Sequence, residues 1–181
     1  TGFETATAAG ALFVHCIATG CSGVGFALNN QNSLAINCSA YNCTLDNFKL
    51  NGIEVECRNC VSYGSAAKQF NAVAITNHAR LINCYGDAGG TGSYAFFNDW
   101  EVQNFTTITG NPYTNSGSGD FSLNNTAGAG AGIRGTALPL TFLCISTTNG
   151  LDGGSVQTSA TPSGGVGQIM MVRGQNIPPE W

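Results

Sequence analysis

The sequence repeats itself with a period of about 22 residues, which lies in the range that solenoid proteins use. Three cysteines follow one another at this interval, and a fourth comes after a slightly longer one. Phenylalanines repeat with the same period at Phe26, Phe48 and Phe70. In a solenoid each repeat stacks on its neighbour and contributes one layer of a continuous core. The four cysteines are Cys16, Cys38, Cys60 and Cys84.

The length of the repeat selects the type of solenoid. Two-helix repeats need about 33 residues or more, and leucine-rich repeats need a Leu-x-x-Leu-x-Leu pattern that this chain lacks. Gly and Asn interrupt the chain at short intervals, which disfavours long helices. A coil of three short strands and three bends fits the period, and stacked coils place equivalent residues about 4.8 Å apart. The sequence therefore predicts an all-β, single-stranded parallel β-helix, with about five coils in residues 11–124.

Stacked coils place the repeating cysteines in a column, here called the cysteine ladder. The residue before the ladder position is Asn in four successive copies of the repeat. Asn tolerates the left-handed backbone of a sharp bend, and stacked Asn amides can hydrogen-bond to one another. We therefore predict an Asn ladder beside the cysteine ladder, with Phe105 in the cysteine slot of the last copy. Alternation along a strand predicts that Leu34, Ile36, Cys38 and Ala40 face the core. The ladder residues are Asn37, Asn59, Asn83 and Asn104, with His15 in the first copy.

These Asn-Cys pairs, followed by small residues and Phe-x-Leu, resemble the pectate-lyase-like right-handed parallel β-helix superfold. The segments 110–113 and 119–124 resemble the closing coil of secreted and phage-associated β-helix proteins. The segment 150–157 resembles their short final strand. The resemblance covers residues 11–158 and implies a right-handed coil. It implies little about function, because one superfold hosts many activities.

We expect three segments along the chain. Residues 1–10 are a lead-in or the remnant of an upstream coil, 11–158 form the β-helix, and 159–181 are a linker and an apolar tail. Within the β-helix, the Gly/Ala-rich stretch 125–136 is expected to be a flexible loop and 137–146 a strand packed on the stack. No cap is evident at the N-terminal end, so we expect an upstream segment or another subunit to supply it.

The charge pattern excludes several partners. Only 9% of the residues are charged, against about 25% in a typical domain. The net charge is −4, and the six basic residues are scattered singly. A nucleic-acid surface or a polybasic membrane patch would need clustered Lys and Arg. We therefore expect neither nucleic acid nor membrane as a partner.

The cysteine count of eight raises the question of disulfides and metals. The four ladder cysteines fit buried free thiols. Cys21 and Cys43 form a further pair one period apart, within disulfide reach across adjacent coils, and both the bonded and the free form stay open. Cys57-x-x-Cys60 lacks the second pair of a zinc site, so we expect no metal and no cofactor. Four Asn-x-Ser/Thr sequons occur, of which Asn42 and Asn124 are the least constrained and Asn37 and Asn104 lie in the ladder.

Two carboxylate pairs are candidates for a catalytic site, because a glycosidase needs two carboxyl groups about 5–10 Å apart. They are Glu54 with Glu56 and Asp99 with Glu101. Arg58 and Arg80 are also one period apart and are expected to stack, with no acidic cluster beside them. Outward charges that keep a solenoid soluble explain all of these residues, so we assign no catalytic residue. His15 and His78 accompany no recognisable nucleophile motif.

These observations lead to two functional hypotheses. The first is a non-catalytic structural module of a virion appendage, such as a tail fibre, head fibre or spike, or of an extracellular filament. It would form a homo-oligomer or larger assembly through the helix ends and the C-terminal tail. The alternative is a carbohydrate-active enzyme or glycan-binding module acting on cell-surface polysaccharide. The exposed pair Tyr41 and Tyr63, at one coil position, suits either sugar stacking or lateral packing.

Overall fold

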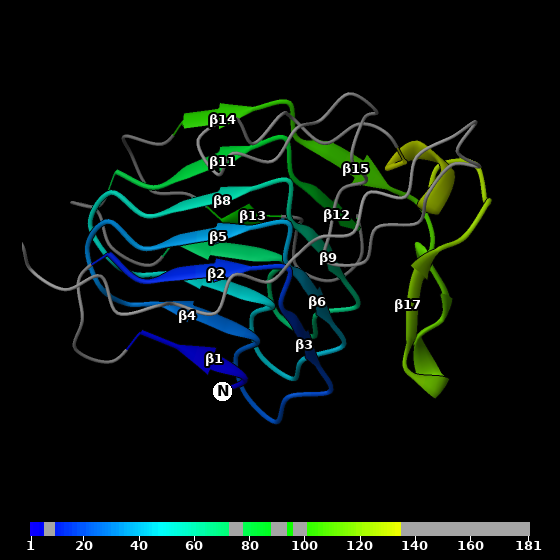
Figure 1. Cartoon of the computed structure of the whole chain (residues 1–181), viewed down its shortest axis with the longest axis horizontal. Helices are drawn as coiled ribbons and strands as arrows, with labels where there is room; N and C mark the ends of the chain where they lie inside the picture. Colours follow the sequence, from blue (N-terminus) through cyan, green and yellow to red (C-terminus); the bar gives the residue numbers. More distant parts are fainter. Residues whose placement is uncertain (6–9, 73–77, 88–93, 96–100, 135–181) are drawn as a thin grey trace, which may run out of the picture.

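The chain folds as an all-β parallel solenoid of about four turns (Figure 1). The computed structural model describes residues 1–5, 10–72, 78–87, 94–95 and 101–134. The expected strands at 137–146 and 150–157, the linker and tail at 159–181, and Asp99 lie outside these residues. Within the described part the helices are two three-residue 3-10 turns, neither of which has the length to cross a membrane.

Three parallel sheets run along the stack, and each coil contributes one strand to each sheet. Sheet A contains β1 (Phe3–Glu4), β4 (Phe26–Leu28), β7 (Phe48–Leu50), β10 (Phe70–Ala72) and β13 (Tyr94–Ala95). Sheet B contains β2 (Leu12–Val14), β5 (Leu34–Ile36), β8 (Glu56–Arg58), β11 (Arg80–Ile82) and β14 (Glu101–Gln103). Sheet C contains β3 (Ile17–Thr19), β6 (Ser39–Tyr41), β9 (Val61–Tyr63), β12 (Tyr85–Asp87) and β15 (Thr106–Ile108). The first coil is thus β1 to β3, the second β4 to β6, and so on.

The interior consists of columns of like residues, as the repeat predicts. The rings of Phe3, Phe26, Phe48 and Phe70 stack with centroid separations of 4.9, 4.9 and 4.8 Å and nearly parallel planes. The four ladder cysteines pack in the same core, fully buried except at Cys16 in the first coil. In these columns the thiol is the polar side-chain group that needs a partner. The S–H groups of Cys38, Cys60 and Cys84 each donate to a backbone carbonyl of the coil below.

Left-handed residues form the bends between sheets B and C. The φ angles of the Asn ladder lie between 48° and 55°, and His15 has φ 54° in the first coil. The Asn59 amide donates to Asn37 Oδ1 at 3.2 Å, and the Asn83 amide donates to Asn59 Oδ1 at 2.9 Å. The predicted Asn ladder is therefore confirmed. The other two bends repeat in the same way, with left-handed residues at Gly10, Asn32 and Glu54 and at Gly20, Asn42 and Gly64.

The predicted inward direction of Leu34 and Ile36 is wrong. Ala35, at the centre of β5, belongs to the inner core, while Leu34 and Ile36 project to the outer face of sheet B. Leu34 is partly exposed there, and Ile36, which pairs with Arg58, is buried. The left-handed Asn37 occupies the corner between two strands, so the alternation of β5 does not continue into β6. Cys38 and Ala40 do face the core as predicted.

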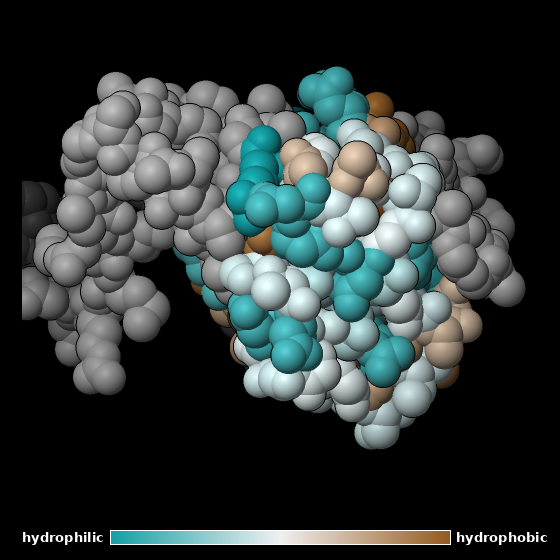
Figure 2. Space-filling model, turned by 90° about the vertical axis from the view of Figure 1, so that its right-hand side faces the viewer, coloured by the Kyte–Doolittle hydropathy of each residue, from teal (hydrophilic) through white to brown (hydrophobic). Residues whose placement is uncertain are grey.

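A hairpin covers the outer face of sheet C and forms a second hydrophobic cluster there. It consists of the antiparallel strands β16 (Tyr113–Asn115) and β17 (Asp120–Leu123), joined by the 3-10 turn η1 (Ser116–Ser118). The expected closing coil is thus wrong for residues 113–123, which leave the stack and pair antiparallel. Viewed from this side, the described surface is mainly hydrophilic to neutral (Figure 2), because the apolar residues of the hairpin point inward.

Two further features complete this cluster. The rings of Tyr41 and Tyr63 stack outward at 6.1 Å, and Tyr113 and Phe121 of the hairpin pack edge-on against Tyr41. Of the two interpretations of the tyrosine pair, the structure shows lateral packing. The Gly/Ala-rich segment is not a free loop in its described part, because η2 (Gly130–Gly132) leads into Ile133, which is fully buried in the same cluster.

Candidate functional site

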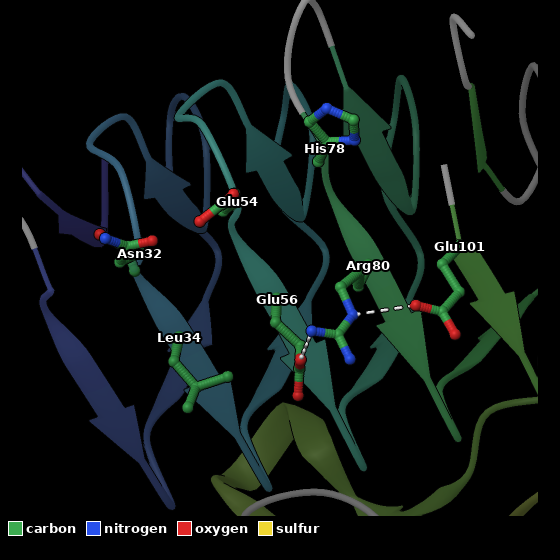
Figure 3. Close-up of a pocket in the computed structure, with 8 residues that line it drawn as sticks. Asn32, Leu34, Glu54, Glu56, His78, Arg80 and Glu101 are labelled. Carbon is green, nitrogen blue, oxygen red and sulfur yellow. Dashed lines mark hydrogen bonds and ion pairs between the residues drawn. The ribbon is translucent and has the colours of Figure 1, made fainter. Parts of the chain in front are cut away.

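A groove of about 560 Å³ lies on the outer face of sheet B (Figure 3). It crosses four consecutive strands, from β5 to β14, and its walls combine acidic, basic and neutral polar side chains with one leucine. The residues that line it are Asn32, Ser33, Leu34, Glu54, Glu56, His78, Arg80 and Glu101.

Strand register places the charged residues in one column. Leu34 pairs with Glu56, Glu56 with Arg80, and Arg80 with Glu101. Residues paired across parallel strands project on the same face and interact directly. The sequence predicts that Arg58 and Arg80 stack, and this prediction is wrong, since Arg58 pairs with Ile82.

The cause is the length of one connection. Five residues separate β7 from β8, whereas seven separate β10 from β11. The two extra residues move Arg80 beside a carboxylate instead of another guanidinium. Three acidic residues therefore accompany the arginines, which corrects the expectation that no acidic cluster lies beside them.

Ion pairs run along this column. Arg80 Nη1 lies 3.3 Å from Glu56 Oε2, and Arg80 Nε lies 3.1 Å from Glu101 Oε2. Arg58 Nη2 lies 2.7 Å from Glu56 Oε1, so Glu56 accepts from two guanidinium groups. Its carboxylate oxygens are thus already engaged as acceptors, and Glu56 is badly placed to give a proton to a substrate.

Glu54 and His78 differ from the column residues. Glu54 sits in a left-handed bend with φ 53°, just before β8, and His78 precedes β11. Both are exposed, and in Figure 3 both lie beside the upper part of the groove, where no dashed line reaches them. Within the described residues, these two side chains are the ionisable groups of the groove that take no part in its ion pairs.

The candidate carboxylates can now be placed. Glu54, Glu56 and Glu101 all line the groove, and Asp99 lies outside the described residues. Glu56 and Glu101 share Arg80 between them, and Glu56 also pairs with Arg58, so both carboxylates lie in ion pairs rather than being set as an acid against a base. The sequence reasoning missed the lining segment Asn32, Ser33 and Leu34. Only the register of this segment against residues 54–56 would have revealed it.

The cysteines that the structure describes form no metal-binding cluster. The seven described cysteines are free thiols, and no group of three or more His, Cys, Asp or Glu within the described ranges could hold a metal ion. Burial raises the pKa of the Cys38 and Cys60 thiols well above the usual value, so both stay protonated as core residues do.

The sequons divide by environment. Asn37 is fully buried in the ladder, whereas Asn42 and Asn104 are exposed at their bends. The Asn124 amide donates to Asn111 O at 2.7 Å and Tyr113 O at 3.1 Å, and its Oδ1 accepts from two backbone N–H groups. A glycan on Asn124 would therefore displace the contacts that hold the hairpin.

No family model, no curated protein and no solved structure matched this chain.

Proposed function

We propose that this chain is a structural module that gives rigid length to a larger assembly, such as a virion appendage or an extracellular filament. It would join other subunits through the ends of its stack. The support comes from the ends themselves, because a parallel solenoid leaves an unpaired strand edge at each one. The edge strands are β1, β2 and β3 at one end and β13, β14 and β15 at the other.

The observation that carries this proposal is the exposure of apolar residues at these ends. Val102 pairs with the fully buried Leu81 and so continues an inward-facing column, yet it is 37% exposed. At the opposite end Phe13, which pairs with the buried Ala35 and packs against the inner core, is only partly buried. Within the described residues, the core is therefore open at both ends, and a second subunit stacked there would bury it.

The test compares core-column residues at the ends with exposed apolar residues on the sides of the stack. Phe13→Lys and Val102→Lys place a charge in the open core column at the two ends. Leu45→Lys and Ile53→Lys are the matched controls, because these residues lie in bends and are 53% and 48% exposed. We expect light scattering at micromolar concentration to give an oligomer for the native chain and both controls, and a smaller species for both end variants. A monomeric native chain, or dissociation by the controls alone, would refute the proposal.

A second candidate function is binding of cell-surface polysaccharide in the groove. The observation that favours it is the open pair Glu54 and His78 beside the exposed guanidinium of Arg80. Together these groups offer a carboxylate acceptor and N–H donors for sugar hydroxyls.

A polysaccharide panel tests this candidate, read by calorimetry for binding and by reducing ends and unsaturated uronate absorbance for cleavage. Glu54→Gln and His78→Ala should each weaken binding of any glycan found by at least tenfold. Asp120→Asn, an exposed carboxylate on the hairpin, is the control and should leave binding unchanged. Binding that survives both groove substitutions would exclude the groove as the site.

A further inference from the structure

Cys21 and Cys43 occupy the same position in the first two coils. Each follows directly on a left-handed bend residue, Gly20 with φ 58° and Asn42 with φ 52°. Thr44 N–H donates to Cys21 O at 2.9 Å, which fixes the two coils in register at this point. Stacked residues of adjacent coils lie about 4.8 Å apart, inside the Cα separation that a disulfide allows, about 4.4–6.8 Å.

The two thiols are held only weakly where they are. Cys21 Sγ contacts Thr19 O and Cys43 Sγ contacts Tyr41 O, each at 3.8 Å, so both side chains have the same orientation one coil apart. A Cβ built on Gly2 would lie 2.9 Å from Cys21 Sγ, so the glycine provides the space that this sulfur occupies. Rotation of Cys21 towards Cys43 gives up one long contact. The Cβ atoms of stacked residues lie about 4.8 Å apart, so a small local approach brings them within the separation of about 3.5–4.5 Å that a disulfide requires.

The ladder cysteines offer a contrast within the same chain. Cys38, Cys60 and Cys84 are fully buried, and each donates to a carbonyl of the coil below at 3.2–3.5 Å. An oxidant has no access to them. In the third coil the position of Cys43 is taken by Ser65, whose hydroxyl donates to Leu45 O at 2.7 Å. Cys21 and Cys43 therefore have no third thiol stacked on them at this position of the next coil. Of the two, Cys21 is partly exposed and Cys43 is buried.

We propose that Cys21 and Cys43 form a disulfide that fastens the first coil to the second when the chain meets a small-molecule disulfide such as oxidised glutathione. The Cys21 thiol loses its proton, and its sulfur attacks one sulfur of the oxidant, releasing one glutathione thiolate. The Cys43 thiol then loses its proton, and its sulfur displaces the second glutathione from Cys21. Two protein thiols are oxidised, one disulfide is reduced, and the two protons end on two glutathione molecules.

This assignment gives the two cysteines separate roles. Burial raises the pKa of the Cys43 thiol to about 11, so the partly exposed Cys21 makes the first attack. The resulting bond closes one full coil and restrains the unfolded chain over that length. It would secure the first coil, whose strands lie at the edge of every sheet.

The test incubates the native chain with oxidised glutathione, blocks the remaining thiols in denaturant, and maps the products after chymotryptic digestion. Cleavage after Phe13, Phe26 and Tyr41 separates Cys43 from Cys21 and from Cys38. We expect a cross-linked peptide containing Cys21 and Cys43, loss of two free thiols, and a thermal midpoint several degrees above that of the reduced chain.

Two variants make the result specific. Cys21→Ser should lose both the cross-link and the oxidant-dependent rise in midpoint, while its midpoint under reducing conditions equals that of the reduced native chain. Cys16→Ser should keep the cross-link, because it alters only the ladder. Full alkylation of Cys21 and Cys43 after equilibration with the oxidant, or a cross-link between Cys16 and Cys38, would overturn the proposal. Cys16 and Cys21 share the peptide 14–26, so fragmentation of the cross-linked peptide in the mass spectrometer locates the bond. This native-chain map decides the matter even if a variant fails to fold, and a bond at Cys16 would overturn the proposal.

Discussion

The Asn ladder gives the sharpest test of how this fold is held, and Asn59 is its central member. The Asn59 side chain is fully buried, donates to Asn37 and accepts from Asn83, and its backbone has φ 53°. Replacement by Ala removes both ladder hydrogen bonds. It also places Ala in a left-handed backbone conformation that Asn tolerates better.

The magnitude follows from these two losses. Each buried polar partner deprived of a hydrogen bond costs about 1–3 kcal/mol, and a left-handed Ala costs about 1–2 kcal/mol. With two deprived partners, we therefore expect Asn59→Ala to lower the free energy of unfolding by about 3–8 kcal/mol. Asn59→Gly loses the same hydrogen bonds without the strain, so its loss should be smaller by about 1 kcal/mol.

Asn104 provides the matched control. It has nearly the same backbone, with φ 55°, but it is exposed in the last coil. Asn104→Ala should therefore cost only the strain, about 1–2 kcal/mol. Urea unfolding followed by far-ultraviolet circular dichroism measures all three losses, provided that the slopes agree. Equal losses for Asn59→Ala and Asn104→Ala, or native stability in Asn59→Gly, would refute the claim that the amide ladder stabilises the stack.

Three further outcomes follow from the packing and the thiols. Phe48→Ala, in the centre of the ring column, should cost about 3–5 kcal/mol in the same urea assay. Phe121→Ala should release the hairpin before the stack, seen as amide exchange that rises in residues 113–123 and not in the coils. In reducing buffer the stability should fall as the pH rises above 9, by about 1.4 kcal/mol per pH unit for each affected thiol. The folded state keeps Cys38, Cys43 and Cys60 protonated while the unfolded chain loses those protons, and the share of Cys43 is lost between the usual pKa of 9.0 and about 11. A stability that stays flat over this range would contradict the assigned burial.

The fold was predictable because its strongest constraints are local and repeat. The Asn that precedes the ladder position predicts where the backbone adopts a left-handed conformation. The fixed period predicts which residues of neighbouring coils stack on one another. The ring column at Phe26, Phe48 and Phe70 and the amide ladder both follow from these two facts. Both are made of contacts between equivalent residues of neighbouring repeats, so the period alone identifies the partners.

The errors arise where that periodicity is interrupted. Strand alternation carried through a bend predicts core positions for Leu34 and Ile36, but a left-handed corner residue resets that alternation. The regular period predicts a stack of Arg58 on Arg80, but the coil between them has two extra residues. The hairpin at 113–123 resembles a coil in sequence because alternating apolar residues suit parallel and antiparallel strands equally well.

The groove itself is best understood from the rule that governs the columns. Inside the stack a column gains by repeating one residue, since rings and amides attract their own kind at this spacing. Outside it a column of one charge would repel itself, because like charges directly opposite each other destabilise a strand pair. The sequence Glu56, Arg80, Glu101 along sheet B satisfies this requirement and needs no ligand to explain it. Glu54 and His78 lie off the column and have no such explanation, so any recognition by this face should depend on them, while the column residues should matter first for stability.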